Sequence, residues 1–167
     1  IPYLKSDDIK NKYWQRRFSK QMKRKIGLVW SGSTIHKKDQ NRSLILNQLT
    51  SLLELPFEFH SLQKEIRNVD QKNIKKYKTL YQHQNDLNDF SDTAALLNQM
   101  NLIISVDTAV AHLAGTLGKK VWVLLPFMPD FRWLLDREDS PWYPKMRLFR
   151  QPKPGDWESV IQQIVIE

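Results

Sequence analysis

The segment 102–118 constrains the fold of this chain most strongly. Residues 102–106 form a short apolar run, which is typical of a strand that is covered on both faces. Asp107 and Thr108 follow directly and begin a helix of small residues that Gly118 ends. A strand that leads straight into a helix places main-chain N–H groups and the positive end of a helix dipole at the carboxyl edge of a parallel sheet. We therefore expect an anion site, most naturally for phosphate, at this junction.

The rest of the chain predicts strands and helices in alternation. The expected strands lie at 25–30, 57–62, 79–81, 102–106, 120–125 and 146–149. The expected helices lie at 8–23, 44–53, 91–100, 108–118 and 157–165. This alternation predicts an α/β fold, a Rossmann-like parallel sheet with helices on both faces, preceded by an N-terminal helix. In such folds ligands bind outside the carboxyl ends of the strands.

The net charge of +8 is concentrated in the first part of the chain. Residues 1–25 carry nine Lys and Arg residues against two Asp residues, whereas residues 26–167 carry 17 positive and 16 negative charges. We therefore predict a basic helical leader at 1–25 and a globular domain at 26–167. The apolar residues of the helix expected at 8–23 lie on or near one face, so we expect that face to pack on other residues; they are Ile9, Tyr13, Trp14, Phe18 and Met22. The leader either connects to a missing domain as a solvated helix or binds nucleic acid or an anionic surface.

Several classes of protein are excluded or disfavoured by what the sequence lacks. The chain has no cysteine, so it has no disulfides and no cysteine-bound metal. No apolar run approaches the ~20 residues that span a bilayer, so we expect no membrane span and a cytoplasmic location. The sequence contains no Walker loop, no Gly-x-Gly-x-x-Gly and no Gly-x-Ser-x-Gly, and no spacing typical of a metal site. We predict neither a bound metal nor a resident cofactor.

Polar residues follow four of the expected strands and are therefore candidates for one site. Ser31 and Gly32 come directly after the first strand, where glycine allows a close approach of the backbone to an anion. Arg42 can bind a diphosphate with its planar guanidinium. Thr108 and His112 share one helix face, since they are four residues apart. His112 is either a phosphate donor or a packed histidine that bonds to its neighbours.

Three other features belong to the same edge of the sheet. Gln63 follows the second strand, and Asp107 precedes the helix of the opening segment. Because a carboxylate would repel an anion, we expect Asp107 to cap the helix and orient neighbouring donors, or to bind a hydroxyl group. The segment 126–144 predicts a long loop rich in Pro, Trp, Asp and Arg, and a loop of this length is either functional or packed on itself.

The residues at this edge resemble a known family. The resemblance runs in order from about residue 26 to 165 and is strongest at segments 27–32, 41–43, 61–63, 91–95, 106–115 and 142–150. These segments resemble the C-terminal region of bacterial tetratricopeptide-repeat glycosyltransferases, which are related to the heptosyltransferase-like glycosyltransferase family 9. One departure is Ser33-Thr34, where the family pattern has Asn-Pro.

The resemblance implies a GT-B architecture in which this chain is the C-terminal, donor-binding half. It also implies metal-independent transfer of a sugar from a nucleotide-diphosphate sugar to an acceptor, a protein or a glycan. The donor-site residues it implies are Ser31, Gly32, Arg42, Thr108 and His112 at the diphosphate, Gln63 near the nucleoside and Asp107 near the sugar or phosphate. The catalytic residue is left unassigned, since the acceptor-activating base normally belongs to the other domain.

Three alternatives to an active transferase stay open. Even as a transferase, the fragment alone is expected to be inactive or incomplete, because the acceptor domain, together with any tetratricopeptide repeats, is missing. The alternatives are an epimerase, a binding module and a degenerate donor site. A sugar-nucleotide epimerase shares the two-domain architecture but needs no acceptor. A module that binds nucleic acid or an anionic surface through the basic leader would lose its affinity steeply with salt, and a degenerate donor site would bind without catalysis.

Overall fold

The computed structural model describes residues 2–20 and 22–167 of the chain. Positions 1 and 21 of the predicted leader lie outside the described residues. The sheet consists of six parallel strands in the order β3-β2-β1-β4-β5-β6. The strands are β1 (Lys25–Val29), β2 (Glu58–Ser61), β3 (Leu80–Tyr81), β4 (Leu102–Val106), β5 (Val121–Leu125) and β6 (Met146–Arg150). The predicted α/β, Rossmann-like parallel sheet is confirmed.

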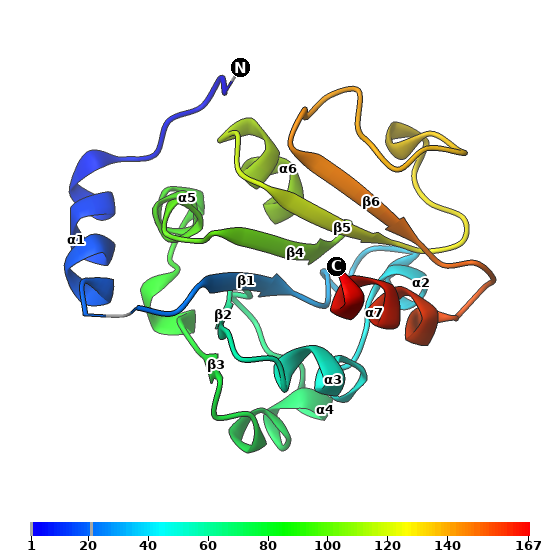
Figure 1. Cartoon of the computed structure of the whole chain (residues 1–167), viewed down its shortest axis with the longest axis horizontal. Coiled ribbons are helices and arrows are strands. Elements are labelled where there is room, and N and C mark those ends of the chain that lie inside the picture. Colours follow the sequence, from blue (N-terminus) through cyan, green and yellow to red (C-terminus); the bar gives the residue numbers. More distant parts are fainter. Residues whose placement is uncertain (1, 21) are drawn as a thin grey trace.

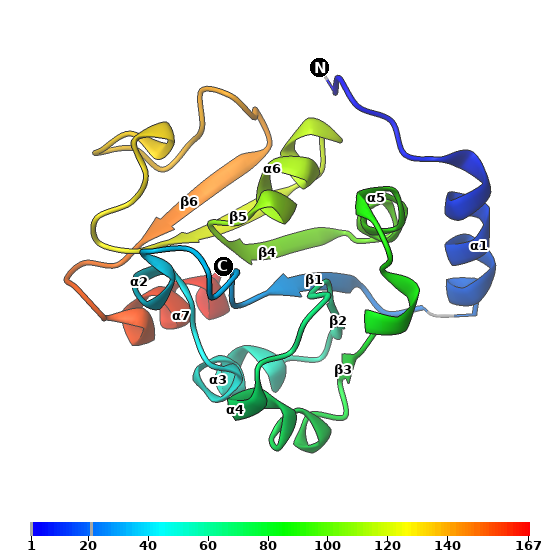
Figure 2. The ribbon, with the colours of Figure 1, turned by 180° about the vertical axis from the view of Figure 1, so that it is seen from behind.

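Helices cover both faces of this sheet (Figures 1 and 2). On one face lie α5 and α6, with α1 packed outside α5, and on the other face α3 packs against α7. The helices are α1 (Asp8–Phe18), α2 (Asp39–Arg42), α3 (Thr50–Leu53), α4 (Asn68–Gln71), α5 (Phe90–Asn98), α6 (Ala109–Thr116) and α7 (Trp157–Ile166). Short 3₁₀ turns lie at Leu46–Leu49, Ile74–Lys76, Gln84–Asp86 and Phe131–Trp133.

The helix boundaries follow local capping chemistry. Asp89 is the N-cap residue of α5, and its carboxylate accepts from the main-chain N–H of Asp92, so this helix begins one residue before the predicted residue 91. Gly118 has a φ of +69°, the left-handed conformation that ends α6 as predicted. The predicted helix 44–53 is instead a 3₁₀ turn followed by α3. The buried Asp70 carboxylate accepts from the N–H of Leu46 and so holds the start of this segment.

The leader helix α1 belongs to the core. It ends at Phe18, earlier than the predicted residue 23. Trp14 and Phe18 are buried, and their rings pack against His83 and His60 at the edge of the sheet. The expected packing face is thus confirmed for these two aromatic residues. It is wrong for Ile9, Tyr13 and Met22, which are 80%, 50% and 98% exposed.

The strand register brings the polar loops that follow β1 and β4 next to each other at the carboxyl edge of the sheet. Val29 of β1 pairs with Ser105 of β4, so the loops that follow these two strands begin side by side. Loops of β5 and β6 leave the same carboxyl edge, since all the strands are parallel. Within residues 2–20 and 22–167, no helix is long and apolar enough to cross a bilayer.

Candidate functional site at the carboxyl edge

A pocket of about 210 Å³ lies where the loops after β1, β4 and β5 meet. We call it the rim pocket. Its lining residues are His36, Lys38, Asn41, Arg42, Asp107, Thr108, Ala109, His112, Pro126, Met128, Asp130 and Arg132. Arg42, Asp107, Thr108 and His112 of the predicted site therefore come together in one cavity.

The N-terminus of α6 opens into the rim pocket. Thr108 is the N-cap residue, but its side chain makes no capping hydrogen bond. Its hydroxyl pairs instead with the Ser105 hydroxyl at 3.2 Å. A helix that begins without a side-chain cap leaves main-chain N–H groups of its first turn without an acceptor. Because Thr108 and Ala109 line the cavity, these donors and the helix dipole are placed to meet an anion.

Arg42 is held on the other side of the same cavity. Its Nη1 donates to the main-chain carbonyl of Asp107 at 2.6 Å, and its Nε lies 3.5 Å from Asp39 Oδ1. The guanidinium rests against Gly32, where an added β-carbon would lie 2.7 Å from Arg42 Cζ. Gly32 therefore provides the space in which the Arg42 side chain lies. From the sequence, the only role expected of this glycine is to allow a close approach to phosphate.

Arg67 and Asp39 support this arrangement, and the sequence analysis did not identify either residue. Arg67 Nη2 donates to the Gly32 carbonyl at 2.8 Å and to the Ser43 hydroxyl at 3.2 Å, and it pairs with the Asp39 carboxylate. The Ser43 hydroxyl in turn donates to Asp39 at 2.8 Å and accepts from the Gly32 N–H at 2.9 Å. No local sequence signal identifies Arg67, because it reaches Gly32 and Asp39 from 35 and 28 residues away.

Ser31, Gly32 and Gln63 do not line the rim pocket. The Gln63 side chain is buried and accepts from the main-chain N–H groups of Trp30 and Ser31 at 2.8 and 2.9 Å. Its Nε2 donates to the Ser31 hydroxyl at 3.0 Å. Ser31 and Gln63 thus hold each other beneath the edge of the sheet, and their predicted ligand contacts stay predictions.

Asp107 and His112 face each other across the first turn of α6. Asp107 Oδ1 lies 3.8 Å from His112 Nε2. The expected capping role of Asp107 is wrong, because Thr108 holds the N-cap position and its side chain makes no capping hydrogen bond. Burial by itself raises the pKa of Asp107. The nearby N–H groups of His112 and Trp133 and the charge of Arg132 lower this pKa by more than burial raises it, so the pKa lies below its usual value. Asp107 is therefore ionised at neutral pH.

His112 is also a packed residue. Its Nδ1 lies 3.1 Å from the Tyr143 hydroxyl, and its ring stacks on Trp133 with centroids 5.0 Å apart. The long loop 126–144 thus folds back over α6 through the buried Trp133 and also lines the rim pocket with Met128, Asp130 and Arg132. In the part of the chain that the structure describes, no three His, Asp or Glu side chains converge as metal ligands.

Comparisons with known proteins support the fold. No protein-family model matches the chain. The chain is 33% identical to Protein FlbA of Caulobacter vibrioides over 76 residues, which are 46% of this chain and 12% of that protein. It is similar to the solved structure of E. coli ADP-heptose lps heptosyltransferase II, with a TM-score of 0.58 and 12% identity over 99% of this chain. The chain thus spans 53% of that heptosyltransferase, whose likeness at this identity establishes a shared fold.

Proposed function

We propose that this chain is the donor-binding domain of a glycosyltransferase. In this proposal it holds a nucleotide-diphosphate sugar while the sugar is transferred, without a metal ion, to an acceptor. The observation that carries the proposal is that the open N-terminus of α6 and the Arg42 guanidinium border the same cavity at the carboxyl edge of the sheet. Main-chain N–H groups and a guanidinium are the donors that a diphosphate needs.

The charges around the rim pocket fit this role. Lys38, Arg42 and Arg132 bring positive charge to its lining, against Asp107 and Asp130. Asp130 pairs with Arg132 at 2.9 Å and Asp39 lies 3.5 Å from Arg42 Nε, so each guanidinium is already partly neutralised by a carboxylate. These cations, together with the helix dipole, take the place that a divalent ion fills in metal-dependent transferases.

Asp107 has a different task in the proposed site. An ionised carboxylate accepts hydrogen bonds and repels phosphate, so its partner is a hydroxyl group of the sugar or the ribose. The His112 ring at 3.8 Å and the Arg42 bond to the Asp107 carbonyl hold this residue in place. The proposed order along the pocket is therefore diphosphate at Thr108 and Arg42, and a hydroxyl group at Asp107.

The fold comparison supports the class of reaction. The similar structure is a heptosyltransferase for ADP-heptose, and this chain corresponds to about half of its length. We extend the proposal to a heptosyltransferase-like member of glycosyltransferase family 9 with GT-B architecture that acts in the cytoplasm. A second domain, with or without tetratricopeptide repeats, would supply the other wall of the cleft, the acceptor site and the base that activates the acceptor.

Binding calorimetry with UDP, GDP and ADP in the presence of EDTA tests the donor site. We expect one of the three diphosphates to bind with one-to-one stoichiometry despite the chelator. Arg42→Gln should weaken that binding at least about tenfold, the effect of losing one charge-assisted contact. Lys37→Gln is the matched control, since Lys37 is exposed and does not line the rim pocket. The absence of binding by all three, or equal affinities of the two variants, would contradict the proposal.

A further inference from the structure

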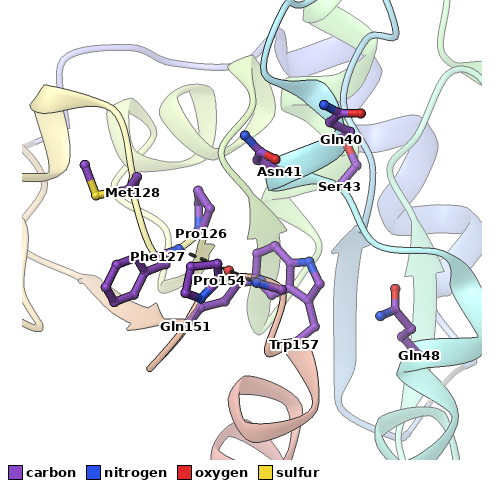
Figure 3. A pocket seen from close by; sticks show the side chains of 11 residues that line it. Gln40, Asn41, Ser43, Gln48, Pro126, Phe127, Met128, Gln151, Pro154 and Trp157 are labelled. Carbon is purple, nitrogen blue, oxygen red and sulfur yellow. Dashed lines mark hydrogen bonds between the residues drawn. The ribbon is translucent and has the colours of Figure 1, made fainter.

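A second cavity, of about 390 Å³, adjoins the rim pocket (Figure 3). We call it the amide pocket. It is lined by Gln40, Asn41, Ser43, Gln48, Pro126, Phe127, Met128, Gln151, Pro154, Gly155 and Trp157. The two cavities share Asn41, Pro126 and Met128 and are therefore neighbours along the carboxyl edge of the sheet. Its volume falls within the roughly 300–1,000 Å³ of small-molecule sites.

The lining of the amide pocket contains no ionisable side chain among the described residues. Its polar side-chain groups are primary amides, the Ser43 hydroxyl and the indole N–H of Trp157. Each amide offers two N–H donors and a carbonyl acceptor. A sugar hydroxyl both donates and accepts, so it matches such groups. A carboxylate or phosphate placed here would have no counter-charge, which sets the amide pocket apart from the basic rim pocket.

Gln151 gives the clearest sign of an absent ligand. It is only 4% exposed, and its Oε1 accepts from the main-chain N–H groups of Phe127 and Gly155, both at 3.1 Å. These two bonds fix the orientation of the amide, with Oε1 as the acceptor and Nε2 as its second polar end. Nε2 is buried and has no hydrogen-bond partner among residues 2–20 and 22–167. An unpaired buried donor is costly. Because Nε2 itself has almost no accessible surface, an acceptor oxygen in the pocket would satisfy it after a small shift of the Gln151 side chain or its neighbours.

Aromatic residues supply the apolar part of the pocket. Trp157 begins α7 and Phe127 follows β5, and both side chains border the cavity beside Gln151 and Pro154 (Figure 3). Phe127 is 44% exposed and so offers ring surface to a ligand. Amides next to aromatic surface are suited to a compound with hydroxyl groups around a carbon ring.

We infer that the amide pocket holds the sugar of the donor and that this sugar is a neutral one, without a carboxylate. The inference rests on the proposed function, because the rim pocket must first place the diphosphate. The sugar then occupies the adjoining cavity, where Gln151 Nε2 donates to one of its oxygens. Gln40 and Gln48 line the amide pocket but not the rim pocket. In this arrangement they contribute to binding of the sugar and do not contact the diphosphate.

The test compares each nucleoside diphosphate with its sugar nucleotide by calorimetry on the whole chain. The pairs are UDP with UDP-glucose and with UDP-N-acetylglucosamine, GDP with GDP-mannose, and ADP with ADP-glucose. We expect at least one sugar nucleotide to bind about fivefold more tightly than its diphosphate, a gain that corresponds to one or two hydrogen bonds.

Two variants show where this gain arises. Gln151→Glu keeps an oxygen for the Phe127 and Gly155 N–H groups but removes the Nε2 donor, and Gln40→Ala removes an exposed amide without disturbing the core. Both should abolish the gain from the sugar and leave the affinity for the diphosphate unchanged. Gln163→Ala is the control, because Gln163 is an exposed glutamine outside the amide pocket.

The outcomes separate this inference from the proposed function. If a diphosphate binds but its sugar adds no affinity, or if both variants keep the full gain, the inference is overturned and the donor site stands. If none of the diphosphates binds, the proposed function fails, and the inference fails with it.

Discussion

Arg42 Nη1 donates a hydrogen bond of 2.6 Å to the main-chain carbonyl of Asp107. This bond joins α2 to the junction of β4 and α6, two segments that lie 65 residues apart in the sequence. It fixes the guanidinium at the rim of the cavity that the first turn of α6 faces. The proposed diphosphate site therefore depends on a residue whose position is set by long-range contacts.

Gly32→Ala should disturb this position without unfolding the chain. A β-carbon at residue 32 would lie 2.7 Å from Arg42 Cζ, and the side chain would have to move away from Asp107. We expect about a tenfold loss of affinity for the nucleoside diphosphate that wild type binds. Ser33→Ala, at an exposed neighbour, should bind like wild type, and equal affinities of the two variants in calorimetry would contradict this prediction.

Arg67→Met should lower the free energy of unfolding by about 2 kcal/mol, because Asp39 and the Gly32 carbonyl lose a charged donor in a partly buried place. Urea unfolding measures this change. Arg137→Met is the control, since the Arg137–Asp139 pair is exposed and pairs of that kind contribute less than about 1 kcal/mol. The prediction is wrong if the two variants unfold at the same urea concentration.

Trp14→Ala should destabilise the chain by about 3–5 kcal/mol, because this ring is 2% exposed and packs on Phe18 and His83. Ile9→Ala on the same helix should change stability by less than about 0.5 kcal/mol, since Ile9 is 80% exposed. A similar, small effect of both substitutions in thermal unfolding would show that α1 is not part of the core.

His60 and His83 should make stability depend on pH. His60 Nδ1 lies 2.9 Å from His83 Nε2 beneath α1. Burial, together with the charges of the neighbouring His83 and Lys25, lowers the pKa of His60 to about 3. Burial and the charge of Arg17 lower the pKa of His83 to about 4, although the charge of Asp86 raises this pKa in part. Both pKa values lie below the unfolded value of about 6.5.

The stabilisation is therefore complete above about pH 6.5 and is lost as the pH falls toward 4 and 3, because the unfolded chain binds protons more readily. Urea unfolding at pH 7.5, 6 and 5 measures the loss. His60→Leu/His83→Leu should lose less stability over this range than wild type, whereas His36→Ala, at an exposed histidine, should follow wild type. A parallel loss in all three proteins would refute the role of the pair.

Sequence patterns predicted the parts of the fold that depend on local chemistry. The apolar run of β4, the small residues of α6 and the glycine that ends it are contiguous, so the strand-to-helix junction was predicted correctly. The segment 44–53 was predicted as one helix because its leucine spacing is helical. Its start is held by the buried Asp70 carboxylate, which accepts from the Leu46 N–H from 24 residues away, a contact that leucine spacing does not indicate.

The site shows the same limit. Thr108 and Arg42 were predicted from the suitability of their groups for phosphate, and the structure places both at one cavity. That they bind phosphate stays a prediction. The sequence did not indicate that the Gln63 amide bonds to the backbone beside Ser31, or that Arg67 and Asp39 hold Arg42 against Gly32. These contacts arise only when distant loops meet. The division of the chain at residue 25 stays a prediction, although α1 packs on the domain that follows it.

Backbone amide NMR during titration with UDP, GDP and ADP shows whether the first turn of α6 binds a diphosphate. We expect one diphosphate to shift the amide resonances of Thr108 and Ala109 most strongly, with smaller changes at Arg42. If every shift fell instead on residues 20–25 of the basic leader, or if no diphosphate shifted the first turn of α6, the account would be contradicted.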